Sequence, residues 1–292
     1  MNRDALLSPI VAGTWQLHQW GLDTAGLVRW IEQAVDLGIT SFDHADIYGG
    51  YTVEGLFGDA LAAAPGLRRR LQIVTKCGIK LVSPQRPRHG AKSYDSSRAH
   101  VLASVDQSLR ALRCEHIEVL LIHRPDLLMD PEELADTFRH LLAAGKVLHF
   151  GVSNFTTRQL AMLHKRHPLV THQVEFSPLQ MRALADGTLE QSLDLGLRPM
   201  VWSPLARGRV PTGSDDQARR VRDLLHELGA EHDVSAATMA YAWILRHPSR
   251  PWPIAGSRRI EGLREASAAL SLRLSAEDWY RVWQASIGHE LP

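Results

Sequence analysis

The chain has 292 residues, 45% of them hydrophobic and 22% charged, a composition typical of a globular protein with a large core. Its formal net charge of +1 provides no global basic field, so neither nucleic acid nor an anionic membrane surface is expected as a partner. The two cysteines, Cys77 and Cys114, exclude a disulfide framework, and with no secretory pattern over Met1–Ile10 they predict a cytoplasmic protein.

Short apolar runs alternate with longer amphipathic segments along the whole chain. This alternation is typical of right-handed βαβ units that build a parallel sheet. In chain order, the predicted strands are Pro9–Gly13, Thr40–Asp43, Gln72–Lys76, Val119–His123, Phe150–Ser153, Val170–Glu175, Met200–Ser203 and Trp252–Ala255. The predicted helices are Thr24–Leu37, Ser96–Leu112, Pro131–Ala144, Thr157–His167, Leu189–Leu195, Arg219–Glu231, Ala236–Arg246, Ile260–Leu270 and Ala276–Ile287.

Eight strands spread over the whole chain favour a closed barrel over an open sheet. The predicted fold is therefore an α/β protein, a (β/α)8 TIM barrel that forms a single domain over residues 1–292. The helix over Ala276–Ile287 is an extra C-terminal element outside the barrel. Two connections, Cys77–Asp95 and Leu205–Asp216, are long, and long loops of this kind in a compact domain are often functional.

Polar side chains concentrate where the predicted strands end, which is where the active site of such a barrel is built. Asp43 ends the second strand and Tyr48 follows it, Lys76 ends the third strand, and His123 ends the fourth. Taken singly, each of these residues is more often structural than catalytic. The prediction depends on all four reaching the same rim of one barrel.

These four residues make chemical sense for the reduction of a carbonyl group. Hydride addition creates an alkoxide that needs a proton, and a tyrosine with its reference pKa near 10 is a slow donor at neutral pH. The ammonium of Lys76 would lower the pKa of Tyr48, and Asp43 would supply the counter-charge that keeps Lys76 protonated. His123 would hydrogen-bond the substrate oxygen. The hydride itself must come from a cofactor, because no side chain supplies one.

The chain resembles the aldo-keto reductases over essentially its whole length. The resemblance rests on the phrases FDHADIYGG, VTKCG, SVDQSLRALRCEHIEVLLIHRPD, AAGKVLHFGVSNF, HQVEFSPL and VWSPLARG, in this order. A similar pattern of Gly-Ser followed by basic residues occurs in a bacterial oxidoreductase branch of that family. By this resemblance, Asp43, Tyr48, Lys76 and His123 match the family's catalytic tetrad.

The resemblance also implies where the cofactor is held. Ser153, Asn154 and Gln173 match the residues that bind the nicotinamide carboxamide, and Trp202 stands where a tyrosine usually stacks under the ring. The cofactor contacts expected besides these are Thr14, Trp15, Ser203, Leu205, Gly208, Gly256, Ser257, Arg258 and Arg259. No metal ligand is expected.

The chain departs from the family pattern at four further positions. His44 replaces the usual threonine after the catalytic aspartate, and Ala255 replaces a proline before the glycine of strand eight. Gly262 and Ala266 stand where the family carries polar residues that hold the 2′-phosphate and the adenine. NADPH is nevertheless the predicted cofactor.

NADPH is predicted because a pair of arginines stands at a predicted helix start. Arg258 and Arg259 precede the helix that follows strand eight, and a phosphate gains there from free N–H groups, the helix dipole and a guanidinium fork. Neither GxGxxG nor GxxxxGK[ST] occurs, which argues against a Rossmann or P-loop site. The predicted partner is a small carbonyl substrate, and a monomer is expected, with an oligomer left open.

Three other functions compete with this prediction. A metal-dependent hydrolase would need paired histidine ligands such as HxH or HExxH, and neither motif occurs. A regulatory barrel could hold NADPH with little or no turnover, because a fold alone does not decide function. A catalytically inactive homologue is the third alternative, and the altered adenine helix at Gly262 and Ala266 is its only support.

Overall fold

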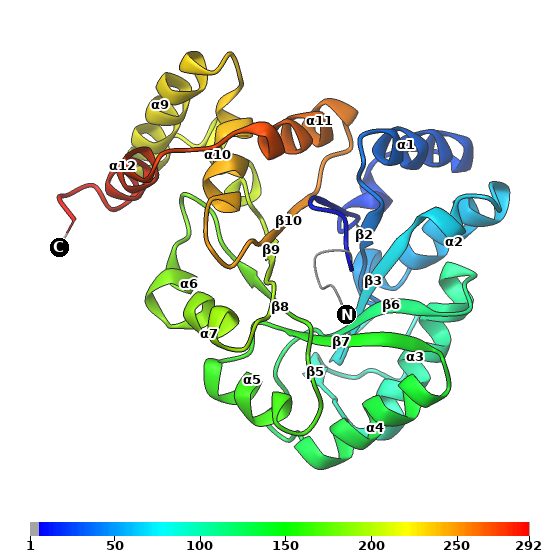
Figure 1. The fold of residues 1–292 in the computed structure, drawn as a ribbon. Coiled ribbons are helices and arrows are strands. Elements are labelled where there is room, and N and C mark those ends of the chain that lie inside the picture. Colours follow the sequence, from blue (N-terminus) through cyan, green and yellow to red (C-terminus); the bar gives the residue numbers. More distant parts are fainter. Residues whose placement is uncertain (1–5, 292) are drawn as a thin grey trace. The chain divides into compact units, whose positions relative to one another are not determined.

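The computed structural model describes residues 6–291. Eight of the described strands form a closed barrel in the order β1-β10-β9-β8-β7-β6-β3-β2 (Figure 1). The strand pairs of this barrel whose register the structure gives are all parallel. The predicted (β/α)8 barrel is therefore confirmed. The strands are β1 (Val11–Gly13), β2 (Ser41–Asp43), β3 (Gln72–Cys77), β6 (Ile117–Ile122), β7 (Val147–Ser153), β8 (Thr171–Glu175), β9 (Met200–Trp202) and β10 (Trp252–Ala255).

The chain divides into two compact units, residues 1–173 and 174–292. The single domain over residues 1–292 stays a prediction. In the first unit, five helices accompany the strands (Figure 1). They are α1 (Thr24–Asp36), α2 (Val53–Ala63), α3 (Arg98–Leu112), α4 (Pro131–Ala143) and α5 (Thr157–His164), with short 3-10 turns at η2 (Leu17–Gln19), η3 (Tyr48–Gly50) and η4 (Arg68–Arg70).

Helix α2 was not among the predicted helices. Its sequence, VEGLFGDALAA, carries two glycines in eleven residues, and glycine weakens a helical pattern. One of them has a packing role. A Cβ at Gly58 would lie 1.9 Å from the carbonyl oxygen of Ala111 in α3, so only glycine lets the two helices approach this closely.

Many of the other predicted bounds differ from the observed ones, each by at most three residues. Strand β6 begins at Ile117, two residues before the predicted start, because Ile117 pairs with Val147 of β7. The strand ends at Ile122, so His123 is the first residue of the loop. Helix α5 ends at His164 and not at His167.

Each long connection contains ordered structure. The segment from Cys77 to Asp95 includes a two-stranded antiparallel hairpin of β4 (Ile79–Lys80) and β5 (Ser93–Tyr94). The segment from Leu205 to Asp216 includes η5 (Ala206–Gly208) and α8 (Arg209–Thr212).

The second unit is mainly helical around its two short strands. Trp243 and Trp279 stack with centroids 5.1 Å apart, and each indole Nε1 donates to the other residue's carbonyl oxygen. This pairing holds the predicted C-terminal helix, Ala276–Ile287, against the helix that contains Trp243. The observed bounds of the C-terminal helix equal the predicted ones. Besides α8 and η5, the described helices of the second unit are α6 (Arg182–Ala185), α7 (Thr188–Asp194), α9 (Asp216–Glu231), α10 (Ala236–Leu245), α11 (Ile260–Ala268) and α12 (Ala276–Ile287), with a 3-10 turn at η6 (Ala269–Ser271).

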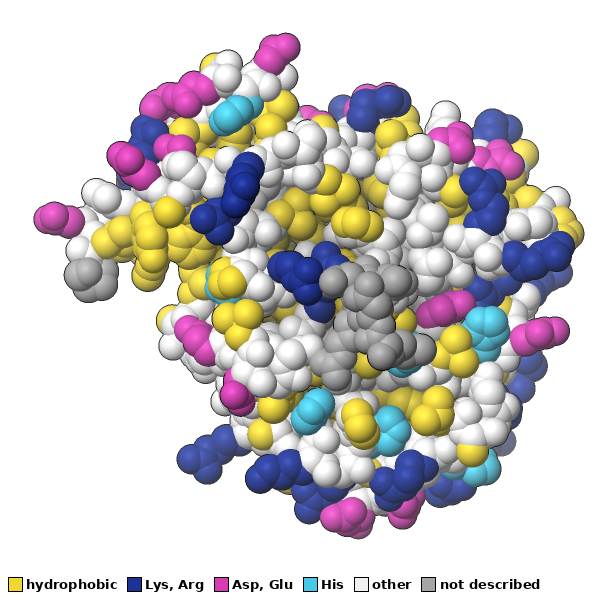
Figure 2. Space-filling model, in the orientation of Figure 1, with side chains coloured by type: hydrophobic (Ala, Val, Ile, Leu, Met, Phe, Trp, Pro, Cys, Tyr) yellow, Lys and Arg dark blue, Asp and Glu magenta, His cyan; other side chains and the backbone are white. Residues whose placement is uncertain are grey.

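The surface carries both signs of charge. On the face drawn in Figure 2, basic and acidic side chains are interspersed, as the formal net charge of +1 leads one to expect. Over residues 6–291, no helix combines the length and the apolar character needed to cross a membrane.

Candidate active site

Lys76 is the centre of a buried polar cluster in the first unit. Its side chain is fully buried, and its Nζ donates to Asp43 Oδ2 at 2.7 Å, to the carbonyl oxygen of His44 at 2.6 Å and to the Tyr48 hydroxyl at 3.0 Å. An ammonium has three N–H groups, so every donor of Lys76 is used. The tetrad lysine, aspartate and tyrosine that the sequence predicted therefore lie together.

The charges of this cluster support one another. Burial by itself would lower the pKa of Lys76, but the charges of Asp43 and Tyr48 and their hydrogen bonds outweigh burial and raise it. Burial raises the pKa of Asp43, and Lys76 and Gln173 limit that rise. Gln173 Nε2 donates to Asp43 Oδ1 at 2.7 Å, so both carboxylate oxygens have a donor. A buried ion pair satisfied in this way is costly to break from one side.

Tyr48 lies in a tight turn directly after strand β2. Gly49, Gly50 and Tyr51 have φ values of 58°, 65° and 76°, and this left-handed run returns the chain toward helix α2. Burial raises the pKa of Tyr48, and the Lys76 charge opposes that rise without reversing it. The sequence predicted that Lys76 would lower this pKa. The direction of the Lys76 effect is as predicted, but the loss of water around the phenol outweighs it.

His123 follows strand β6 and faces Tyr48 edge-on, with ring centroids 6.0 Å apart. Burial, Lys76 and Arg124 hold the pKa of His123 well below its usual range, so the imidazole is neutral. Its Nδ1 is buried and has no hydrogen-bond partner among residues 6–291. A neutral imidazole has one donor nitrogen and one acceptor nitrogen, so it can position a carbonyl oxygen without protonating it.

Three residues predicted to hold the cofactor lie at neighbouring strand ends. Asn154 Nδ2 donates to Ser153 Oγ at 2.7 Å, and the backbone N–H of Asn154 donates to the carbonyl oxygen of Gln173 at 3.0 Å. Asn154 has a φ of 57°, a left-handed conformation that asparagine adopts more readily than most other non-glycine residues. Because Gln173 also donates to Asp43, these amides are linked directly to the tetrad.

Thr14 and His44 are bonded to each other beside the tetrad. Thr14 Oγ1 donates to the carbonyl oxygen of Asp43 at 2.9 Å and lies 2.9 Å from His44 Nδ1. Burial and the Lys76 charge lower the pKa of His44 to about 3, so this family departure adds no titration near neutral pH. Trp15, the next predicted contact, has 53% of its surface exposed.

A second buried cluster, which the sequence analysis missed, lies on the other side of strand β3. Thr75 Oγ1 donates to Glu54 Oε1 of helix α2 at 2.6 Å, and the backbone N–H of Asp46 donates to the carbonyl oxygen of Lys76 at 3.0 Å. Both carboxyl groups are almost fully buried, at 5% exposure for Glu54 and 8% for Asp46. The signal was in the phrase DHADIYGGYTVE, where Asp46 and Glu54 flank the glycine turn.

The remaining predicted cofactor residues lie in the second unit, on two segments that follow strands β9 and β10. In the first segment, Ser203, Ala206, Arg207 and Gly208 all have positive φ, and the Arg207 guanidinium lies 5.7 Å from the ring centre of Trp202. Leu205, between them, is half-buried.

In the second segment, Ser257 accepts from the Arg259 backbone N–H at 3.1 Å, and Arg258 and Arg259 are exposed. A Cβ at Gly262 would lie 2.5 Å from Ser257 Oγ, so the departure at Gly262 makes room for Ser257. The other departure, Ala266, is fully buried and offers no polar group.

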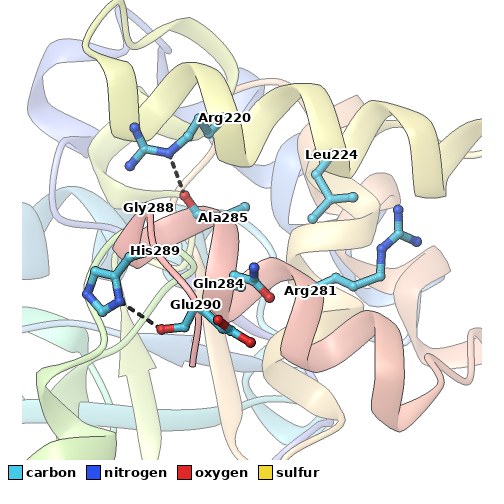
Figure 3. Close-up of a pocket in the computed structure, with 8 residues that line it drawn as sticks. All are labelled: Arg220, Leu224, Arg281, Gln284, Ala285, Gly288, His289 and Glu290. Atoms are coloured by element: carbon cyan, nitrogen blue, oxygen red, sulfur yellow. Dashed lines mark hydrogen bonds between the residues drawn. The ribbon is translucent and has the colours of Figure 1, made fainter. Parts of the chain in front are cut away.

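The second unit also carries an open groove of about 500 Å³ between α9 and α12 (Figure 3). Arg220 Nε donates to the carbonyl oxygen of Ala285 at 3.0 Å, which holds the guanidinium against Gly288 (Figure 3). None of the predicted site residues lines this groove.

Comparison with known proteins agrees with the fold. The model of the Aldo/keto reductase family matches residues 9–287. The uncharacterized oxidoreductase YcsN of Bacillus subtilis (strain 168) is 47% identical over 297 residues, covering 100% of this chain and 98% of that protein. A 6-dehydroglucose reductase of Agrobacterium fabrum is 38% identical and covers 98% and 96%. The solved structure of a glycerol dehydrogenase from Gluconobacter oxydans matches with a TM-score of 0.85 at 25% identity, covering 97% and 92%.

Proposed function

We propose that this chain, which belongs to the aldo/keto reductase family, reduces an aldehyde or ketone to the alcohol with NADPH, and that Tyr48 is the general acid. One observation carries the proposal: the Tyr48 hydroxyl lies 3.0 Å from a fully buried ammonium that is itself paired with Asp43 at 2.7 Å. A phenol held against an ammonium is suited to donate a proton to a nearby oxygen and to survive as phenolate afterwards.

In this proposal each residue of the cluster has a separate task. Tyr48 donates its proton to the substrate oxygen as that oxygen gains negative charge. Lys76 donates a hydrogen bond to the phenolate oxygen that remains, and Asp43 keeps Lys76 charged and fixed. His123, held neutral by burial and by the cations beside it, donates a hydrogen bond to the carbonyl oxygen and sets its angle.

The residues beside the tetrad fit a nicotinamide. A carboxamide is neutral, with both donors and acceptors, and Ser153, Asn154 and Gln173 offer hydroxyl and amide groups of the same kind at adjoining strand ends. A bound nicotinamide cofactor supplies the hydride. Gln173 has a second task, because its bond to Asp43 ties the predicted carboxamide site to the catalytic charge pair.

We assign the nucleotide end of the cofactor to residues of the second unit. Arg258 and Arg259 are exposed at the start of helix α11, and no side chain caps that helix terminus. Free backbone N–H groups, the helix dipole and guanidinium groups all favour a phosphate. Gly256 and Ser257 precede them in the same segment. Trp202 provides an aromatic face for ring stacking, and Ser203, Leu205 and Gly208 form the loop that follows it.

The Tyr48→Phe variant tests the proposed acid. It removes the proton donor with almost no change in volume, so we expect carbonyl reduction to fall by a factor on the order of 10²–10⁴ or more while NADPH binding stays intact. The variant and the wild type should be assayed with a panel of carbonyl substrates that contains aromatic aldehydes, quinones and hydroxylated aldehydes. The hydroxylated aldehydes are included because similar proteins include a 6-dehydroglucose reductase and a glycerol dehydrogenase. Wild-type turnover in Tyr48→Phe would refute the assignment.

The double variant Arg258→Ala, Arg259→Ala tests the cofactor. If these arginines bind the 2′-phosphate, the KM for NADPH should rise at least about tenfold, equivalent to about 1.4 kcal/mol if KM follows binding. The KM for NADH should barely change, because NADH has no 2′-phosphate. Equal losses for both cofactors would mean that the arginines hold the pyrophosphate or the fold.

A further inference from the structure

The two buried carboxyl groups behind Lys76 have no part in the mechanism above. Neighbouring side chains on a strand point to opposite faces, and Thr75 and Lys76 follow this rule. Lys76 reaches Asp43 and Tyr48, whereas Thr75 reaches Glu54 in the first turn of helix α2. Glu54 is therefore joined by one hydrogen bond of 2.6 Å to the residue that precedes the catalytic lysine.

Asp46 completes this second cluster from the segment between β2 and Tyr48. Its backbone N–H is bonded to the Lys76 carbonyl oxygen at 3.0 Å, so Asp46 is fixed to the same strand. Its Oδ1 is buried and has no hydrogen-bond partner among residues 6–291. An orphaned oxygen of this kind is expensive for a carboxylate and much less so for a protonated acid.

Among residues 6–291, neither carboxyl group has an ion pair of the kind that joins Asp43 to Lys76. Burial raises the pKa of Glu54 to about 7, and burial followed by the Glu54 charge raises the pKa of Asp46 well above its usual range. The positive charges of Lys76 and Arg86 oppose this rise in both pKa values. The hydroxyl groups of Thr75 and Ser108 donate hydrogen bonds to Glu54 and oppose the rise in its pKa. The thiol of Cys77 also faces the pair and stays protonated, because burial and both carboxyl groups raise its pKa.

We propose that Glu54 is a positioning residue for proton transfer by Tyr48. The carboxyl groups of Asp46 and Glu54 are both protonated in the most active enzyme. Reduction slows when this pair loses a proton to water. The reasoning rests on the proposed function of Tyr48 and Lys76. The Lys76 charge favours ionisation of both carboxyls, and by reciprocity an ionised carboxyl holds the Lys76 proton more tightly. An ionised carboxyl also offsets the positive charge of Lys76, and that positive charge makes Tyr48 a better acid. A weaker acid protonates the substrate oxygen more slowly.

The pH dependence of kcat tests this inference. At saturating NADPH and aldehyde, we expect wild-type kcat for reduction to fall by roughly three- to tenfold between pH 6 and pH 8 as the pair ionises. Glu54→Gln keeps an oxygen for Thr75 but cannot ionise, so its kcat should stay on the upper plateau throughout that range. If Glu54→Gln shows the wild-type step, or if the wild type shows no step, the inference is wrong.

A matched control contacts the same strand from strand β6. Glu118 accepts from the backbone N–H of Ile73 at 2.6 Å and pairs with Arg68 at 3.0 Å, so it also anchors strand β3 through a carboxylate. Glu118→Gln should retain the wild-type step. Asp46→Asn serves as the second variant: Asp46 stays protonated while Glu54 ionises, so the step should remain when Asp46 can no longer titrate. Loss of the step in Asp46→Asn would show that Asp46 carries the titration and would contradict the role given to Glu54.

Infrared difference spectra supply a readout that is independent of catalysis. Between pH 6 and pH 8, the wild type should lose a protonated carboxyl band that Glu54→Gln lacks. A missing band change overturns the inference even if Tyr48 is the acid. Conversely, a normal band change together with an active Tyr48→Phe would overturn the proposed function and not the titration of the pair.

Discussion

The two sides of strand β3 carry buried carboxyl groups of opposite character. On the inner side, Asp43 has a donor on each oxygen, from Lys76 at 2.7 Å and from Gln173 at 2.7 Å. On the outer side, Glu54 and Asp46 have only neutral hydrogen-bond donors, and one Asp46 oxygen has none among residues 6–291. Burial is nearly complete on both sides. The partner, and not the depth, therefore decides whether a buried acid keeps its charge.

This difference also separates the tasks of two adjacent residues. Lys76 spends all three of its donors on the charged side, so its ammonium cannot also satisfy the outer carboxyls. Its charge still reaches them through the strand, since it favours ionisation of both. On the inner side, Lys76 and Gln173 favour the ionised form of Asp43, whereas burial favours the protonated form of both outer carboxyl groups.

The largest expected effect comes from removing the inner charge partner. Lys76→Met should lower kcat by a factor on the order of 10²–10⁴. It should also destabilise the fold by about 3–5 kcal/mol, because Asp43 is left as an uncompensated buried charge. Urea denaturation and steady-state kinetics measure the two effects separately.

The double variant Asp43→Asn, Lys76→Met is the control for that experiment. It removes both charges, so most of the lost stability should return while activity stays low. If the double variant is as unstable as Lys76→Met alone, the uncompensated charge is not the cause of the instability.

A smaller effect on stability is expected from the outer side. The pKa of Glu54 is about 7 in the folded chain against an ordinary value of 4.5, so between these values the unfolded chain releases a proton that the folded chain keeps. The free energy of unfolding therefore falls as pH rises through this window, by on the order of 3 kcal/mol from Glu54. Glu54→Gln does not lose this free energy of unfolding as pH rises. The difference in the free energy of unfolding between Glu54→Gln and the wild type should therefore change in favour of the variant from pH 4 to pH 8. Urea titrations at the two pH values measure it, and a constant difference would show that Glu54 is not held protonated.

Local patterns determined much of this protein in advance. The alternation of apolar runs predicted the parallel barrel, because period and length are properties of the chain itself. The order of polar residues at strand ends predicted which side chains lie near Lys76, since the carboxyl ends of parallel strands share one rim. The bounds of Ala276–Ile287 were also predicted correctly, with a serine N-cap and a glycine C-cap as local signals.

Other features depend on contacts between distant segments, and the sequence alone did not reveal them. Helix α2 was missed because its two glycines weaken the pattern, and only the carbonyl oxygen of Ala111 against Gly58 explains why a glycine is there. The protonated Asp46–Glu54 pair was missed because a carboxyl group's charge depends on which groups surround it after folding. Lys76 lowers the pKa of Tyr48 as predicted, but the net pKa is raised because the fold removes the water around the phenol, which the sequence alone did not reveal.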